Sequence, residues 1–380
     1  MVSEACKRHK DRKYDRWCLS CENPLCVKCN EHQEHETHDI DPCCVVCREE
    51  SNISIIHLRG NIQQKEIGKR QVRNDFLLEI MLEIDMFHES IIVTDMLEID
   101  EDDNWIRHIS LGLPNTIWIS DKNSLILIDT TGDTLDQLAV TDIGTGVHTV
   151  TNEKELIYIN ENENICKLSK DNTTESTIIL KSDPWRPLCV YSSTLNGDLL
   201  VGSGKYEKDN QTESKINQHF PTEARVNRYD SKMLKIQTIQ YKRRKKKMYK
   251  CPAYITENSN GDVIVSDKRS SHSDDNGVVV VTDRQGIFRF SYNGPPFESQ
   301  SFFPCGICTD GLSNIVVCDH NSGTVQLINK DGHFLMYLLT SPDIMPPWSL
   351  AYDEINHRLL VESSICEIFL YRYINRKDYY

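Results

Sequence analysis

The sequence lacks long apolar runs, and this bounds the protein classes that fit it. Across 380 residues no stretch approaches the roughly eighteen consecutive apolar residues of a membrane-spanning helix, so we expect no membrane insertion. Charged residues follow Met1 almost at once, without the apolar core of a secretory signal peptide. We therefore expect a cytoplasmic protein whose thiols stay reduced.

Positive charge is also in short supply. Lys and Arg number 43 against 57 Asp and Glu, which gives a formal net charge of -14. This balance gives no support to nucleic-acid binding through the surface as a whole. The hydrophobic share of 39% and the charged share of 26% are typical of a soluble globular protein, and the length is enough for two or three domains.

The first forty residues have too few apolar side chains for a core, and metal ligands stand there in four pairs. Within each pair two residues separate the ligands, which are Cys6 and His9, Cys18 and Cys21, Cys26 and Cys29, and His35 and His38. Tetrahedral zinc takes four ligands, so eight ligands predict two zinc ions. Because protein fills every position, we expect structural zinc that adds roughly 10 kcal/mol or more per ion to folding.

Two points about this segment stay open from spacing alone. A disulfide framework would suit a secreted chain, but mixtures of Cys and His in a reducing compartment usually bind metal. His32 forms a second legal pair with His35, so the terminal pair is either His32 with His35 or His35 with His38.

Residues 43–90 are predicted to be a joint followed by a short helical linker. Cys44 and Cys47 form a leftover CxxC in the joint, which fits a half-site, a redox pair or two ordinary thiols. Residues 49–90 are predicted to be helical, most clearly where Phe76, Ile80 and Phe87 share one face. That face either pairs with a second chain in a short coiled coil or packs on the next domain.

From residue 91 onward short β-rich runs alternate with turns, and the runs repeat. Six copies of a four-stranded unit recur with a period of about forty residues, which is typical of propeller blades. The second strands of the six units are predicted at 117–121, 156–160, 199–203, 263–267, 315–319 and 359–363.

The sixth unit runs out of chain after its third strand at 367–372. Residues 92–99 can supply the missing fourth strand, and closing a ring in this way removes an exposed sheet edge. The expected fold is therefore mostly β: a closed six-bladed propeller over residues 91–380, preceded by a two-zinc finger over residues 1–42 and the helical linker.

Two insertions and one basic run interrupt the blades. The insertions at 204–224 and 269–277 lie between second and third strands, so both should emerge on one face, where propellers carry binding function. The run Lys242–Lys247 connects the third unit to the fourth. It fits a contact for phosphate or an acidic partner, an import signal, or a solvated loop.

The first strands should line the central channel, where a catalytic propeller would carry its reactive groups. They offer Arg107, His108, His148, Cys189, Tyr254, Cys308 and Ser349. These residues include no converging carboxylates, so we expect no metal or triad for hydrolysis there. His108 and His148 are expected to be packed or hydrogen-bonded.

The paired ligands resemble the B-box type 2 zinc finger of the tripartite-motif family. The repeat units resemble NHL repeats, best at Pro304–Asp310 followed by Val317–Asp319, although Asn160, Ser203 and Ser363 replace the repeat's aspartate. The resemblance covers nearly the whole chain, which looks similar to the expanded B-box/propeller proteins of molluscs. It favours His35 with His38 as the terminal pair and implies a cross-brace with one zinc on Cys6, His9, Cys26 and Cys29 and the other on Cys18, Cys21, His35 and His38.

The resemblance also bears on function. Family members with an amino-terminal RING domain are E3 ubiquitin ligases, and only five residues precede Cys6, so we expect no RING here. We expect a scaffold or adaptor whose propeller captures a protein partner, with self-association through the B-box and the helix. The alternatives are a ubiquitin-ligase component whose RING comes from a partner or a longer gene product, and RNA binding by the propeller.

Overall fold

The structure is a computed structural model, and it divides the chain into two units, Met1–Leu82 and Glu83–Tyr380. The residues that it describes are 16–18, 23–25, 37–39, 87–92, 106–121, 123–140, 147–169, 172–182, 184–206, 220–269, 277–296, 301–340, 344, 346–363 and 367–372.

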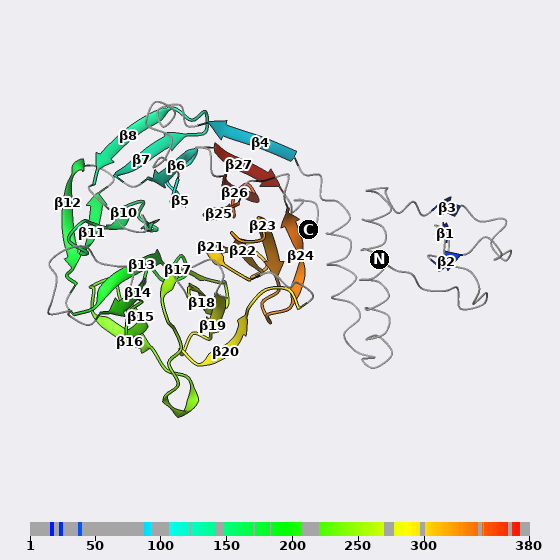
Figure 1. Ribbon diagram of the computed structural model, residues 1–380. Coiled ribbons are helices and arrows are strands. Elements are labelled where there is room, and N and C mark those ends of the chain that lie inside the picture. Colours follow the sequence, from blue (N-terminus) through cyan, green and yellow to red (C-terminus); the bar gives the residue numbers. More distant parts are fainter. Residues whose placement is uncertain are drawn as a thin grey trace. The chain divides into compact units, whose positions relative to one another are not determined.

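The first unit contains a small antiparallel sheet of three short strands (Figure 1). The strands are β1 (Arg16–Cys18), β2 (Asn23–Leu25) and β3 (Thr37–Asp39), in the order β2-β1-β3. Three-residue strands cannot build a hydrophobic core, so a sheet of this size needs another source of stability. Bound metal is such a source in small cysteine-rich domains.

The second unit is a ring of six four-stranded sheets, each a blade of a β-propeller (Figure 1). Blade 1 contains β5 (His108–Leu111), β6 (Thr116–Ser120), β7 (Ser124–Asp129) and β8 (Thr134–Ala139). Blade 2 contains β9 (His148–Val150), β10 (Leu156–Ile159), β11 (Ile165–Ser169) and β12 (Asn172–Leu180). Blade 3 contains β13 (Arg186–Ser192), β14 (Leu199–Lys205), β15 (Glu223–Tyr229) and β16 (Lys235–Ile239).

The remaining three blades follow the same plan. Blade 4 contains β17 (Pro252–Glu257), β18 (Val263–Asp267), β19 (Val278–Thr282) and β20 (Phe288–Tyr292). Blade 5 contains β21 (Pro304–Thr309), β22 (Ile315–Asp319), β23 (Thr324–Ile328) and β24 (Phe334–Leu339). Blade 6 contains β25 (Leu350–Asp353), β26 (Arg358–Ser363) and β27 (Glu367–Arg372), and its fourth strand is β4 (Phe87–Ile92). The six predicted units are confirmed.

Ring closure by a strand from the start of the propeller is confirmed, but the predicted residues were wrong. The closing strand is β4, and residues 93–99 of the predicted strand lie outside the described residues. β4 pairs with β27 from Phe87 opposite Arg372 to Ile92 opposite Glu367. Ile91 is buried opposite Ile368, and this apolar pair fixes the register.

The same strand corrects the carboxyl end of the predicted helix. Phe87–Ser90 are extended, because pairing with β27 satisfies their backbone within a sheet and overrides the helical spacing of Phe87. Residues 49–86, which carry the rest of the predicted helix, lie outside the described residues, as do Cys44 and Cys47.

A recurring Asx turn joins successive strands. In the turn from β7 to β8, Asp129 Oδ1 accepts hydrogen bonds from the backbone N–H groups of Thr131 and Gly132, and Gly132 has a φ of 96°. The same turn recurs at other positions. In each, the side chain of an Asp or Asn accepts a backbone hydrogen bond, and the residue three positions later has a positive φ; these side chains are Asn160, Asp230, Asn258, Asp283, Asp310 and Asn329. This geometry explains why D-x-x-G and related tetrapeptides recur in the turns between strands.

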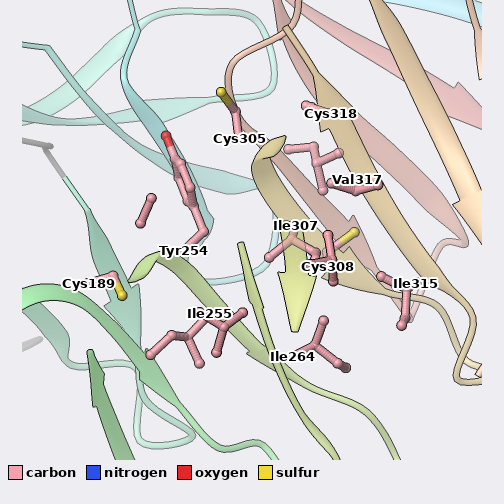
Figure 2. Packing of buried hydrophobic residues seen from close by; sticks show 14 of the residues in the cluster. Cys189, Tyr254, Ile255, Ile264, Cys305, Ile307, Cys308, Ile315, Val317 and Cys318 are labelled. Carbon is pink, nitrogen blue, oxygen red and sulfur yellow. The ribbon is translucent and has the colours of Figure 1, made fainter. Parts of the chain in front are cut away.

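The core lies between the sheets, and the middle strands are buried most completely in blades 4 and 5. In blade 4 every residue of β18 and β19 is buried, and in blade 5 every residue of β22 and β23. Free cysteines fill part of this core, and Figure 2 shows Cys189, Cys305, Cys308 and Cys318 among Ile and Val side chains. Burial raises the pKa of each of these thiols, so they stay protonated and unreactive.

Neighbouring blades approach closely at the innermost strands. Gly306 N–H donates to the Trp348 carbonyl at 2.8 Å, and a Cβ on Gly306 would lie 2.7 Å from Ser349 Cα. Glycine is therefore required where β21 meets β25. Contacts of this kind link β5, β9, β13, β17, β21 and β25 into the ring around the channel.

The insertions and the basic run lie in the predicted connections. The insertions join β14 to β15 and β18 to β19, with residues 207–219 and 270–276 outside the described part of the chain. The run lies between β16 and β17, where the 3-10 turn η3 (Arg243–Lys245) is exposed. Figure 1 shows this connection projecting outward from the rim of the propeller.

Candidate functional site

Two of the eight predicted zinc ligands stand on described strands of the first unit. Cys18 ends β1 and His38 is the middle residue of β3. The register pairs Cys18 with Thr37 and Trp17 with His38, so the two ligand positions are neighbours across the sheet. The other six, Cys6, His9, Cys21, Cys26, Cys29 and His35, lie outside the described residues, as does His32.

The donor set fits zinc. Thiolate and imidazole are the ligands of structural zinc sites, and the five cysteines and three histidines of the four pairs are all of these two types. β2 spans residues between Cys21 and Cys26, so the two middle pairs flank one strand. The β1–β3 pairing brings the backbone positions of Cys18 and His38 close together.

A tyrosine from blade 4 crosses the central channel to blade 1. The Tyr254 hydroxyl donates to the Arg107 carbonyl at 3.1 Å, although blades 1 and 4 face each other across the ring. Its ring stacks on His108 with centroids 5.5 Å apart and planes 11° apart. Figure 2 shows the Tyr254 side chain standing clear of its own strand. The channel at this level is occupied by the protein's own side chains.

The two channel histidines pack against each other, as predicted. The ring of His108 meets that of His148 edge to face at 4.7 Å, and His148 Nε2 lies 3.2 Å from the Trp118 carbonyl. Burial lowers the pKa of His108, and the neighbouring His148 lowers it further. His108 is therefore a neutral aromatic partner of Tyr254 at neutral pH. Ser349, another predicted channel residue, accepts a hydrogen bond from the Ile109 N–H through its Oγ at 3.1 Å.

Three buried carboxylates hold the starts of the innermost strands. Asp267 Oδ1 accepts from the Lys250 and Cys251 N–H groups, both at 2.8 Å, and Asp319 Oδ1 accepts from the Phe303 N–H at 2.9 Å. These are the repeat aspartates of blades 4 and 5. Burial raises the pKa of both, for Asp267 to about 6.

Blade 6 has Ser363 at the corresponding place, and Glu362 takes over the role. Glu362 Oε2 accepts from the Trp348 and Ser349 N–H groups at 3.2 and 3.3 Å. Burial raises the pKa of this carboxyl to about 8. Sequence reasoning missed it because the longer side chain stands one residue earlier, although a buried acid within an apolar strand was a usable signal.

A buried ion network between blades 3 and 4 was also missed. Arg228 binds Glu257 Oε1 through Nη2 at 2.5 Å and Asp198 Oδ2 through Nη1 at 3.3 Å. Ser193 donates to the second oxygen of Glu257. Arg228, Glu257 and Asp198 are 4%, 5% and 8% exposed, so the network replaces water around all three charges. Its members are far apart in the sequence and carry no shared pattern.

Cationic side chains stacked on aromatic rings gather where the first strands begin and the second strands end. Arg225 lies 3.8 Å from the Trp185 ring centroid and Arg186 lies 5.1 Å from that of Tyr206. The sequence could not pair these residues, because the rings come from different strands and connections. Arg186, Arg225, Lys250 and Lys268 are named the cationic cluster below.

Comparison with known proteins agrees with the two-part organisation. The B-box zinc finger family matches residues 2–43. No curated protein matches the sequence. The described residues include no helix that is both long and apolar enough to span a membrane.

The propeller is similar in fold to proteins of solved structure. A gluconolactonase from Xanthomonas campestris has a TM-score of 0.53 at 13% identity, over 75% of this chain and 89% of that one. A putative gluconolactonase has a TM-score of 0.53 at 14% identity, over 75% and 92%. At such identities the likeness shows the fold alone. Residues 2–43 therefore match the B-box zinc finger family, and the six blades of a β-propeller follow them in the same chain.

Proposed function

We propose that this protein is a zinc-dependent interaction scaffold or adaptor of the tripartite-motif type, whose propeller captures a protein partner. The observation that carries the proposal is the union of a B-box with a closed six-bladed propeller in one chain. The B-box match implies zinc binding, and a propeller offers wide loop-bearing faces for recognition.

The zinc is proposed to be structural and to number two ions per chain. Eight thiol and imidazole donors satisfy two tetrahedral sites with no position left for substrate or water. Cys6, His9, Cys26 and Cys29 would hold one ion, and Cys18, Cys21, His35 and His38 the other. When bound, the zinc supplies the stability that three short strands lack.

The channel geometry favours binding over hydrolysis. Tyr254 and His108 occupy the centre, and the carboxylates of Asp267, Asp319 and Glu362 are engaged with backbone N–H groups. Within the described residues no three His, Cys, Asp or Glu side chains gather as metal ligands. A scaffold needs no such group.

Affinity purification of the tagged intact chain, followed by cross-linking mass spectrometry, tests the proposal. We expect protein partners whose cross-links map to propeller loops, and a Cys26→Ser variant should keep those cross-links while losing zinc. Cross-links confined to residues 1–82 would overturn capture by the propeller. Chemical cross-linking of the purified chain with itself tests self-association through the B-box and the segment that follows it.

A ubiquitin-ligase role is the second candidate, and the B-box match favours it. The chain would present a substrate protein, while a RING protein recruits the ubiquitin-loaded E2 enzyme. Ubiquitination assays with purified chain, E2 and a RING-containing partner should show activity only when the partner is present. RNA binding is a third candidate, supported only by the basic run Lys242–Lys247, in which Arg243–Lys247 are exposed.

A further inference from the structure

The cationic cluster has features of a built recognition surface. Its four members stand at one edge of blades 3 and 4: Arg186 begins β13, Arg225 lies near the start of β15, Lys250 precedes β17 and Lys268 follows β18. Strands of a blade alternate in direction, so these positions share the face of the propeller on which the two insertions emerge.

Each member of the cluster is placed by an aromatic ring. Arg225 stacks on Trp185, and Lys250 Nζ lies 4.8 Å from the Phe220 ring centroid. Lys268 Nζ lies 4.7 Å from the Trp348 centroid and 5.2 Å from that of Phe303, so it is held between blades 4, 5 and 6. Cation–π contacts restrict these long side chains, so less conformational entropy is lost when an anion binds them.

Ion pairs with carboxylates neutralise only part of the positive charge of the cationic cluster. Arg186 pairs with Glu163 at 3.2 Å, and Lys250 donates to the Arg269 carbonyl. Within the described residues, no carboxylate forms an ion pair with Arg225 or Lys268. Two half-buried cations, Arg225 and Lys268, are therefore held by rings and not by an ion-paired carboxylate, although Glu223 acts on Arg225 at longer range.

The basic run joins this cluster to the rim. Lys247 Nζ donates to the Thr222 carbonyl at 2.7 Å, in the short segment that carries Phe220 and Arg225. Lys242 Nζ lies 3.6 Å from the Phe288 ring centroid, so both ends of the run are pinned. Between them Arg243–Lys246 are exposed, and Arg244 and Lys245 adopt positive φ values of 62° and 57°. The positive charge thus extends from the channel side to the rim.

We propose that this surface, the cationic cluster with Arg243–Lys246, binds an acidic segment of a partner protein. The inference rests on the proposed scaffold function and names the chemistry of its partner. Separate fixed cations match separate Asp and Glu side chains along an extended peptide. The cationic groups already cover one face of each of these rings, which leaves less open ring surface for the stacking that single-stranded nucleic acid uses.

Charge elsewhere on the protein also favours a peptide over a polynucleotide. The net charge of -14 repels a long polyanion, whereas a short acidic segment meets only the local field. The insertion residues 207–219 and 270–276 contain acids, lie outside the described residues and form no part of the site.

Fluorescence anisotropy with the intact chain and a labelled hexaglutamate peptide tests the inference. We expect saturable binding that weakens as salt rises, and no binding of the matched hexaglutamine peptide. Arg225→Gln with Lys268→Gln should lower the affinity at least about tenfold, and neutralising Arg243–Lys246 should lower it further. Arg225→Lys keeps the charge and should retain most of the binding.

Lys232→Gln is the matched control, since Lys232 is an exposed cation in the β15–β16 turn on the opposite face. Melting curves establish that each variant is folded. Failure of the peptide to bind, or equal binding by the charge variants, overturns the inference. Tighter binding of a labelled oligouridylate that the same variants abolish overturns it in favour of nucleic acid. A protein partner that still cross-links to propeller loops of the charge variants would remove this inference alone and leave the scaffold function standing.

Discussion

The hydroxyl of Tyr254 donates to the carbonyl of Arg107 at 3.1 Å across the centre of the propeller. Tyr254 is 4% exposed and its ring stacks on His108, so blades 1 and 4 are joined through the channel as well as around the ring. β4 joins the start and the end of the propeller within blade 6, whereas this contact joins two blades that lie opposite each other in the ring.

Removing the Tyr254 hydroxyl should destabilise the propeller. Tyr254→Phe keeps the stacked ring but leaves the Arg107 carbonyl without this donor, which should cost about 1–2 kcal/mol. Tyr254→Ala also opens a cavity and should cost about 3–5 kcal/mol. Urea unfolding of the intact chain measures both. Equal losses for the two variants would contradict the role given to the ring.

Glu362 should make stability fall as the solution becomes alkaline. Burial raises its pKa from an ordinary 4.5 to about 8, so between these values the folded state keeps a proton that the unfolded state has lost. The contribution is therefore fully present below pH 4.5 and is lost as pH rises through about 8.

Glu362→Gln keeps an oxygen that can accept from Trp348 and Ser349 and carries no charge. The variant should match the wild type at acidic pH and exceed its unfolding free energy by at least about 1 kcal/mol at pH 9. Chemical denaturation across this pH range measures the difference. A difference that is constant with pH would show that Glu362 does not titrate as stated.

Arg228 should be far more important to stability than surface ion pairs. Arg228→Ala leaves Glu257 and Asp198 buried without their cation, which should cost about 3–5 kcal/mol. The half-buried pair of Lys167 and Glu155, at 3.0 Å, provides the comparison, and Lys167→Ala should cost less than about 1 kcal/mol. Denaturant midpoints report both, and similar losses would argue against a buried network.

Gly306 should tolerate no side chain. The Cβ of Gly306→Ala would press on Ser349 backbone atoms, and the blades would have to separate at a cost of about 1–3 kcal/mol. Ser231→Ala, at an exposed turn position, is the control and should change stability by less than about 0.5 kcal/mol. A stable Gly306→Ala variant would mean that the inner strands are not packed this tightly.

Much of the propeller was predictable from local pattern. Apolar runs such as Val278–Thr282 and turns such as Asp283–Gly286 fix strands and hairpins within a few residues, because both signals are local. The closing strand was harder. Phe87 continues a helical spacing, and only pairing with a strand almost three hundred residues away makes Phe87–Ile92 extended.

The candidate surfaces were less predictable. The predicted zinc ligands can be recognised from their spacing in the sequence. The cationic cluster cannot, because rings such as Trp185 and Trp348 lie next to their cations only after folding. Glu362 replaces a repeat aspartate from a neighbouring position, which a strict repeat pattern does not find.

The zinc content of the intact chain tests the central claim most directly, since the assignment of the first forty residues depends on it. Native mass spectrometry together with elemental analysis should find two zinc ions per chain, and the Cys26→Ser variant should hold fewer. Chelation should abolish protection of residues 1–42 from proteolysis while the propeller stays folded. One zinc per chain, or residues 1–42 that remain protected after chelation, would contradict the account.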